Sequence, residues 1–170
     1  MAMIYLIGFT GVGKTTIGKK LALQKNKIFY DVDNEIEIEE KNNISNIFKL
    51  KGELCFREIE SKILKKAKND SIVSCGGGLP IFKHNMTYIK ENGISIYLKA
   101  SEEDIFKRLS KNLSNRPLVK NMNNKELKLF VKIKIKERER FYRLADYTIN
   151  TSNYSIDEIL VKINSLVISS

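Results

Sequence analysis

Residues 8–15 have the types and spacing of a phosphate-binding loop. They read G-F-T-G-V-G-K-T, which matches the pattern G-x-x-x-x-G-K-[ST], and an apolar run comes directly before them. In this pattern Gly11 and Gly13 let the backbone curl close to phosphate oxygens. The Lys14 ammonium reaches the β- and γ-oxygens, the Thr15 hydroxyl ligates Mg²⁺, and the following helix adds N–H donors at its N-terminus. We therefore predict nucleotide phosphate binding here, rather than a plain glycine turn.

Two carboxylates, Asp31 and Asp33, stand at the end of the second apolar run. A parallel strand delivers its last side chains to the crevice at the carboxyl edge of the sheet, and alternate residues of a strand share one face. Carboxylates placed there can serve Mg²⁺, directly or through water, and can orient or deprotonate a hydroxyl nucleophile. The structural alternative is that one of them caps the helix that follows.

Three consecutive glycines, residues 76–78, close the third apolar run. A turn needs only one glycine, whereas three in a row let bare backbone lie against a ligand and offer it N–H donors. We predict a binding role for this segment. The alternative is a flexible turn between a strand and a helix.

Two arginines occupy positions that suit an anion. Arg57 lies beside the apolar stripe of a predicted helix, and Glu60, three residues on, can brace it while the guanidinium faces the crevice. For Arg57 taken alone, an ordinary surface ion pair is the alternative. Arg138 falls on the apolar stripe of a later helix. An inward arginine needs a counter-charge, which either an internal acid or an anionic ligand can supply.

Five short apolar runs have the length and composition of strands, and amphipathic stretches separate them. The runs cover residues 4–7, 28–30, 72–73, 94–98 and 147–149. This alternation predicts an α/β fold with a mostly parallel sheet covered by helices on both faces. Helices are predicted over residues 14–26, 34–50 with a break near 42–43, 53–68, 80–92, 102–111, 124–143 and 155–168.

Two segments require a choice between alternatives. Residues 35–39 alternate like a strand, but Asp33 or Asn34 is a suitable N-cap and acidic residues favour a first turn, so we predict a helix. Residues 110–124 are polar, lack periodicity and contain Arg116, which is typical of a mobile loop between helices. We predict that this loop is a lid.

Length and composition limit the possible classes of protein. The 170 residues suit one domain, over residues 1–170, and the net charge of +10 is spread among acidic residues, so we predict a solvated basic surface and no nucleic-acid partner. Cys55 and Cys75 form no C-x-x-C motif and are predicted to be free thiols. No apolar run is long enough to span a bilayer and we find no leader, so we expect a soluble, cytoplasmic protein with no membrane partner.

Six motifs, in their order along the chain, make this sequence resemble shikimate kinase. They are G-F-T-G-V-G-K-T-T, D-V-D, F-R-E-I-E, C-G-G-G, N-R-P-L-V and E-R-E-R-F-Y, and together they cover almost the whole chain. The resemblance implies a P-loop fold of the nucleoside-monophosphate-kinase type, with a five-stranded parallel sheet flanked by helices. It also implies Mg²⁺-dependent transfer of the ATP γ-phosphoryl group to the 3-hydroxyl of shikimate, on the route to chorismate and the aromatic amino acids, by a monomer.

The resemblance assigns roles to individual residues. The ATP phosphates are assigned to Gly11, Val12, Gly13, Lys14, Thr15, Thr16 and the lid residue Arg116. Mg²⁺ is assigned to Thr15 and the neighbouring acid Asp31. Shikimate is assigned to Asp33, Arg57, Gly77, Gly78 and Arg138, with the two arginines on its carboxylate. The catalytic residues are then Lys14 and Arg116, which stabilise charge, and Asp33, which orients the hydroxyl or accepts its proton.

The register of the last motif leaves a choice open. The family often has R-x-P-L-Y followed by three residues and Ala-Asp, whereas only two residues separate Tyr142 from Ala145 here. Anchoring on Tyr142 selects Arg138, while anchoring on Ala145 selects Glu137, which cannot bind an anion. We keep Arg138, with Arg140 as the alternative.

Other functions compete with this interpretation. A kinase of the same fold acting on gluconate or a nucleotide is the nearest, and the D-x-D, F-R and G-G-G set argues against it. A regulatory GTPase would need N-K-x-D and D-x-x-G, and neither occurs in the chain. A nucleic-acid-binding module is a third alternative, on charge alone. Arg108, near the start of the predicted lid, is a candidate to pack on adenine.

Overall fold

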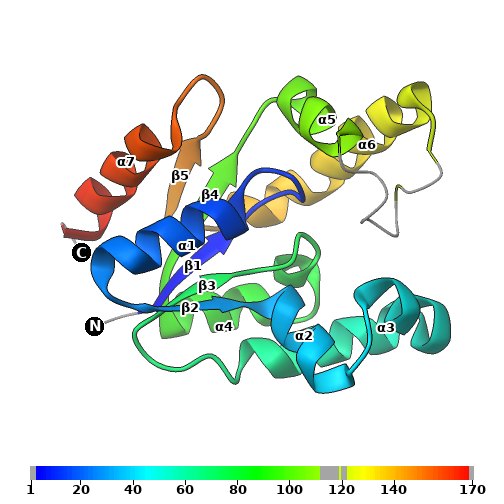
Figure 1. The fold of residues 1–170 in the computed structure, drawn as a ribbon, viewed down its shortest axis with the longest axis horizontal. Coiled ribbons are helices and arrows are strands. Elements are labelled where there is room, and N and C mark those ends of the chain that lie inside the picture. Colours follow the sequence, from blue (N-terminus) through cyan, green and yellow to red (C-terminus); the bar gives the residue numbers. More distant parts are fainter. Residues whose placement is uncertain (1–2, 112–118, 120–121, 169–170) are drawn as a thin grey trace.

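A parallel β-sheet forms the centre of the molecule (Figure 1). The computed structural model describes residues 3–111, 119 and 122–168. The strands are β1 (Met3–Ile7), β2 (Ile28–Asp31), β3 (Ser71–Ser74), β4 (Gly93–Lys99) and β5 (Tyr147–Asn150). They pair in the order β2-β3-β1-β4-β5, and every pairing is parallel. All five predicted strands, and the predicted α/β fold, are confirmed.

The central strand explains where the site forms. All five residues of β1 are buried, as expected for an apolar strand covered on both faces of a parallel sheet. Leu6 is in register with Ser74 of β3, and the Leu6 carbonyl accepts a hydrogen bond from the Cys75 amide at 3.0 Å. The carboxyl ends of β1 and β3 therefore lie side by side. This pairing brings the phosphate loop next to the glycine run.

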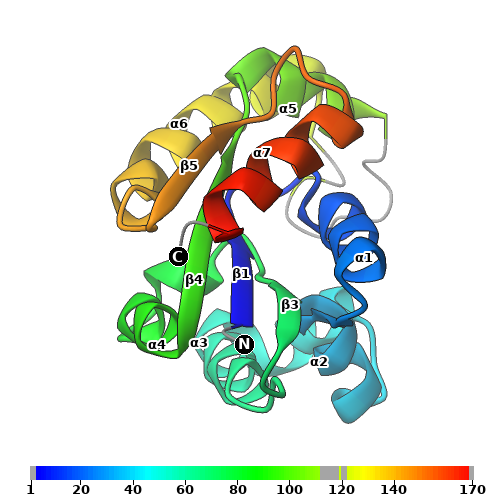
Figure 2. The ribbon, with the colours of Figure 1, turned by 90° about the vertical axis from the view of Figure 1, so that its left-hand side faces the viewer.

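Helices cover both faces of the sheet. They are α1 (Lys14–Lys25), α2 (Val32–Glu40), α3 (Ile44–Leu64), the 3-10 helix η1 (Leu79–Ile81), α4 (Asn85–Asn92), α5 (Glu102–Ser110), α6 (Asn124–Tyr142) and α7 (Ile156–Ile168). Figures 1 and 2 show α1 and α7 together on one face, and α4 and α6 on the other. Within the described part of the chain, no helix has both the length and the apolar character needed to cross a bilayer.

The start of α2 differs from the prediction. The helix begins at Val32, and its N-cap is Asp31, whose carboxylate accepts a hydrogen bond from the Asp33 amide at 3.1 Å. The prediction of Asp33 or Asn34 as the cap was therefore wrong, because the last strand residue already supplies the acceptor. Asp33 lies in the first turn of α2, so helix geometry rather than strand alternation positions its side chain.

Two other helical regions are interrupted. The break predicted near residues 42–43 is confirmed, since α2 ends at Glu40 and Asn43 caps α3. Within α3, Gly52 has φ 78° and ψ 170°, a conformation that is nearly restricted to glycine, and the helix kinks there. The helix predicted over residues 80–92 is divided into η1 and α4.

Candidate active site

The phosphate loop joins β1 to α1 as predicted. Gly11 and Gly13 have φ values of 85° and 105°, which allow the chain to curl back before the helix starts. Lys14 is buried, and its ammonium donates hydrogen bonds to the carbonyls of Gly8 and Phe9 at 2.9 and 3.0 Å. The loop backbone therefore holds a cation at the N-terminus of α1, which is a suitable arrangement for an anion.

A hydroxyl and a carboxylate meet beside this loop. The Thr15 hydroxyl donates a 2.7 Å hydrogen bond to Oδ2 of Asp31, while Oδ1 caps α2. Mg²⁺ prefers oxygen ligands of this kind and usually completes its shell with substrate phosphates and water. The donor pair fits such an ion. Among the described residues, no group of three or more His, Cys, Asp or Glu side chains forms a metal site made of protein ligands only.

Arg57 is held by two acidic side chains of its own helix. Its Nη1 donates to Glu60 at 2.7 Å and its Nη2 to Glu53 at 3.3 Å. Glu60 is fully buried and Arg57 almost so, which distinguishes this pair from an ordinary surface ion pair. The predicted bracing of Arg57 by Glu60 is confirmed.

The glycine run makes room for these charges. A Cβ atom on Gly76 would lie 2.2 Å from a Glu60 oxygen, and one on Gly78 would lie 2.4 Å from Cζ of Arg57. A side chain at Gly76 would displace the Glu60 carboxylate, and one at Gly78 would displace the Arg57 guanidinium. Gly77 faces the other way and lines a cavity. Two of the three glycines therefore accommodate protein side chains, a reason that the sequence pattern did not reveal.

Arg138 reaches the glycine run from α6. Its Nη1 lies 3.5 Å from the position that a Cβ on Gly77 would take, and its guanidinium lies over the Phe9 ring at 5.6 Å. Tyr142, one turn further on, donates a 2.5 Å hydrogen bond to the Gly77 carbonyl. The inward stripe predicted for this helix is therefore present, and it places Arg138 beside the phosphate loop.

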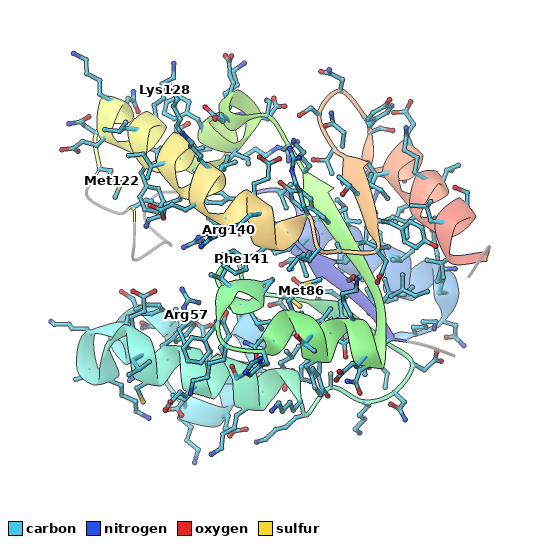
Figure 3. All side chains as sticks on the ribbon, turned by 180° about the vertical axis from the view of Figure 1, so that it is seen from behind. Arg57, Met86, Met122, Lys128, Arg140 and Phe141 are labelled. Carbon is cyan, nitrogen blue, oxygen red and sulfur yellow. The ribbon has the colours of Figure 1, made fainter. Side chains whose placement is uncertain are left out.

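Glu137 and Arg140, the alternatives for this position, make their contacts within α6. Glu137 is exposed and pairs with Lys134 at 2.7 Å. Arg140 is exposed and lies over the ring of Phe141 at 4.7 Å. Figure 3 shows Arg57 and Arg140 on the side of the molecule where α3 and α6 face each other. Of the two arginines, Arg138 is the one that lies next to Gly77, whereas Arg140 lies over Phe141 in the space between α3 and α6.

Two carboxyl groups near the glycine run have unusual electrostatics. Burial, and next the charge of Asp31, raise the pKa of Asp33 to about 6, although Lys14 and Arg57 act in the opposite direction. Burial also raises the pKa of Glu60 to about 7 despite the nearby Arg57, and Asp33 adds to the increase. A neighbouring carboxylate thus disfavours ionisation of each group, Asp31 at Asp33 and Asp33 at Glu60, as expected for like charges in a poorly solvated site. Such pKa values are common at functional sites.

One cavity of about 510 Å³ joins the phosphate loop to Asp33 and Gly77. It is lined by Thr10, Gly11, Val12, Gly13, Lys14, Thr15, Thr16, Ile17, Asp33, Ser74, Cys75, Gly77, Arg108, Thr151, Tyr154, Ile156 and Ile159. The predicted phosphate ligands of the loop and Asp33 therefore share one space. Arg57, Gly78 and Arg138 do not line this cavity; they flank it around Gly77.

The sequence interpretation missed four residues of the cavity lining. Thr151, Tyr154, Ile156 and Ile159 come from the loop after β5 and the start of α7. A signal for this loop was present, because it follows the carboxyl end of a parallel strand, where ligands bind in such sheets. Arg108 also lines the cavity and donates to the Val12 carbonyl at 3.0 Å. Arg116 lies outside the described residues, as does most of the predicted lid over residues 110–124.

Comparison with known proteins identifies the family and the fold of this chain. The family model "Shikimate kinase" matches residues 10–167. The shikimate kinase of Sulfurihydrogenibium sp. is 42% identical over 169 residues, which cover 96% of this chain and 98% of that protein. The crystal structure of shikimate kinase from Bacteroides thetaiotaomicron has a TM-score of 0.92 at 30% identity and covers 98% of both chains. A structure of the Acinetobacter baumannii shikimate kinase in complex with shikimate has a TM-score of 0.92 at 32% identity, over 99% of this chain and 94% of that one. The chain, with its phosphate loop, buried Arg57–Glu60 pair and five-stranded parallel sheet, belongs to the shikimate kinase family.

Proposed function

We propose how this chain carries out the ATP-dependent phosphorylation of shikimate that its family membership assigns to it. One observation carries the proposal: Lys14, Thr15 and Asp33 line the same cavity, which brings phosphate ligands and a carboxylate base to one space. Phosphoryl transfer needs mainly positioning and charge stabilisation, and both require these groups at one place.

The nucleotide occupies the cavity along its length. Its phosphates lie on the backbone of residues 11–16, and Lys14 exchanges its carbonyl partners for phosphate oxygens. The base lies between Arg108 and the loop that carries Tyr154, all of which line the cavity. A guanidinium and aromatic or aliphatic side chains form a suitable surface for a planar ring.

Mg²⁺ is held by Thr15 and, directly or through water, by Asp31. The ion supplies charge neutralisation on the β- and γ-phosphates when it is bound. The hydrogen bond between Thr15 and Asp31 keeps both oxygen donors together beside the loop.

The acceptor binds around the glycine run. Arg57 and Arg138 hold the shikimate carboxylate, and the backbone at Gly77 and Gly78 supplies N–H donors. Asp33 orients the 3-hydroxyl and accepts its proton. A pKa of about 6 suits this role, because an effective base titrates near the working pH.

The remaining parts of the proposal come from the sequence. Arg116 closes over the phosphates with residues 110–124 and stabilises the transferred charge. The protein is a cytoplasmic monomer that does not bind nucleic acid.

A coupled assay of ADP release tests the proposed function. Purified protein is given ATP and Mg²⁺ with shikimate, with gluconate, with nucleoside monophosphates, or with no acceptor. We expect turnover with shikimate alone. Turnover only with another acceptor would retain the phosphate loop assignments and reject those of Arg57 and Arg138.

A further inference from the structure

Three side chains join the start of α5 to the loop after β5. The Ser152 hydroxyl donates a 2.5 Å hydrogen bond to Oδ2 of Asp104 and accepts one from the Ser101 amide at 2.9 Å. The Ser101 hydroxyl donates to the same Asp104 oxygen at 2.8 Å. One carboxylate oxygen therefore holds two segments that are almost fifty residues apart in the chain.

The loop held in this way forms a wall of the nucleotide cavity. Ser152 lies between Thr151 and Tyr154, and both of these neighbours line the cavity, whereas Ser152 and Asp104 do not. Thr151 is further tied to the Lys99 carbonyl, to which its amide and its hydroxyl donate at 2.7 and 3.1 Å. Ser152 follows Thr151 directly, and its hydrogen bonds to Ser101 and Asp104 hold it in place. They therefore also set the direction in which the chain continues to Tyr154.

The same helix carries a second wall of the cavity. Arg108 lies four residues after Asp104, on the same face of α5, and donates to the Val12 carbonyl of the phosphate loop. Hydrogen bonds from Ser152 and Ser101, together with the charge of Arg108, keep the pKa of Asp104 below its usual range. Asp104 is thus a charged acceptor between two cavity-lining elements.

We propose that Asp104 is a positioning residue for nucleotide binding, which acts through Ser152 on the loop of residues 151–155 and through α5 on Arg108. The proposal rests on the proposed function, because it takes this cavity to be the nucleotide site. Holding both walls before the ligand arrives lowers the ordering cost of binding, and charged hydrogen bonds are the stronger kind. Asp104 itself touches neither the nucleotide nor the reacting atoms.

The competing explanation is an ordinary helix cap. Ser101 is the N-cap of α5, and its hydroxyl accepts from the Asp104 amide at 3.1 Å, so part of this network serves the helix alone. The hydrogen bond from Ser152 to Asp104 does not contribute to capping, because Ser152 belongs to the loop after β5 and not to α5. Substitutions on the two sides of that bond therefore separate the two explanations.

The test is ADP titration of the folded protein, monitored by calorimetry, together with KM values for ATP and shikimate. Asp104→Ala is expected to raise the ADP Kd and the KM for ATP about tenfold, the equivalent of one charged hydrogen bond of about 1.4 kcal/mol. The KM for shikimate should stay within about twofold. Asp104→Asn keeps an acceptor oxygen and should recover most of the loss. Glu103→Ala is the matched control, since it removes an exposed neighbouring carboxylate that pairs with Lys107 on the same helix.

Ser152→Ala leaves the cap of α5 intact and decides the question if Asp104→Ala folds poorly. It should raise the ADP Kd nearly as much as Asp104→Ala, and the double variant should be no worse than the larger single effect. Ser152→Thr keeps the hydroxyl and should bind ADP normally. An ADP Kd for Asp104→Ala and Ser152→Ala equal to that of Glu103→Ala would overturn the proposal, as would an equal rise in the KM for shikimate. Because ADP titration needs no acceptor, a failure of the shikimate assignment would appear only as missing wild-type turnover.

Discussion

In the phosphate loop, the groups proposed to bind phosphate belong to consecutive residues, 11–16, and most of them are backbone groups. The acceptor side, where shikimate is proposed to bind, instead combines charged side chains from α2, α3 and α6. The backbone of the loop needs only its local sequence to reach the required shape. The acceptor side instead brings Asp33, Arg57, Glu60 and Arg138 together around three glycines. Local motifs can therefore specify phosphate binding, while selection of the acceptor depends on tertiary packing.

The two sides also differ in their effect on stability. A loop that presents N–H groups has little desolvation cost, because those groups would be unpaired at a helix start in any case. Placing Glu60 and Asp33 in a poorly solvated space is unfavourable, since burial raises the pKa of both carboxyls and Asp33 adds to the increase at Glu60. We therefore expect substitutions on the phosphate side to affect turnover, and those on the acceptor side to affect both binding and stability.

The largest effect should come from Lys14→Ala. Loss of the cation that meets the transferred charge should reduce kcat by about 10²- to 10³-fold, with the KM for shikimate nearly unchanged. Steady-state kinetics at saturating shikimate measures this. Lys20→Ala, an exposed lysine on the same helix, is the control and should behave as wild type. A kcat within a few-fold of wild type would show that Lys14 does not stabilise the transition state.

Arg138 and Arg140 provide a matched pair on the acceptor side. Arg138→Ala should raise the KM for shikimate about 10²-fold, because it removes one arm of the proposed carboxylate clamp. Arg140→Ala should change it by less than about threefold, since an exposed charge contributes little. Titration of shikimate in the kinase assay gives both values. The reverse order of effects would assign the clamp to Arg140.

Asp33→Asn tests the conflict between function and stability. The folded protein keeps the Asp33 proton up to about pH 6, whereas the unfolded chain loses it near its ordinary lower pKa. Between these two pKa values the unfolded chain has released the Asp33 proton and the folded protein still holds it, so a rise in pH favours the unfolded state. The free energy of unfolding of the wild type should therefore fall as pH rises through this range.

Asp33→Asn removes this loss. The variant should be inactive, yet more stable than wild type at pH 7.5 by at most about 3 kcal/mol, and by less to the extent that water in the cavity solvates the carboxyl. Urea unfolding between pH 4 and pH 8 measures the difference. Part of the slope should remain because of Glu60. Glu39→Gln, an exposed carboxyl on the same helix, should show no such gain; equal behaviour of the two variants would contradict the electrostatic explanation.

The smallest effect is expected at the kink of α3. Gly52→Ala places a Cβ in open space, so its cost is the backbone strain at φ 78°, about 1 kcal/mol or somewhat more. Because Arg57 lies just beyond the kink, the KM for shikimate should rise a few-fold while the KM for ATP stays constant. Urea unfolding and kinetics of Gly52→Ala and the exposed control Lys49→Ala test this. A rise in the KM for ATP alone would contradict the prediction that the kink positions Arg57 for shikimate.

The sequence by itself determined the strands, most helices and the phosphate loop. These features depend on contacts between near neighbours: apolar runs, glycines at left-handed positions and the loop-to-helix junction. Arg57 and Glu60 were also predictable as a pair, since one helical turn separates them. Asp33 and Arg138 were also predicted as candidates, from a strand end and an apolar helical stripe, and the resemblance to shikimate kinase assigned both to shikimate.

Only the tertiary structure decided which of Arg138 and Arg140 faces the glycine run, and why that run has three glycines. It also placed Asp33 in a helix and brought Tyr154 to the cavity. Each of these facts depends on how segments distant in the chain pack together. A local pattern states which side chains a segment offers, but the burial, charge and free space around each one are set by its partners from elsewhere in the fold.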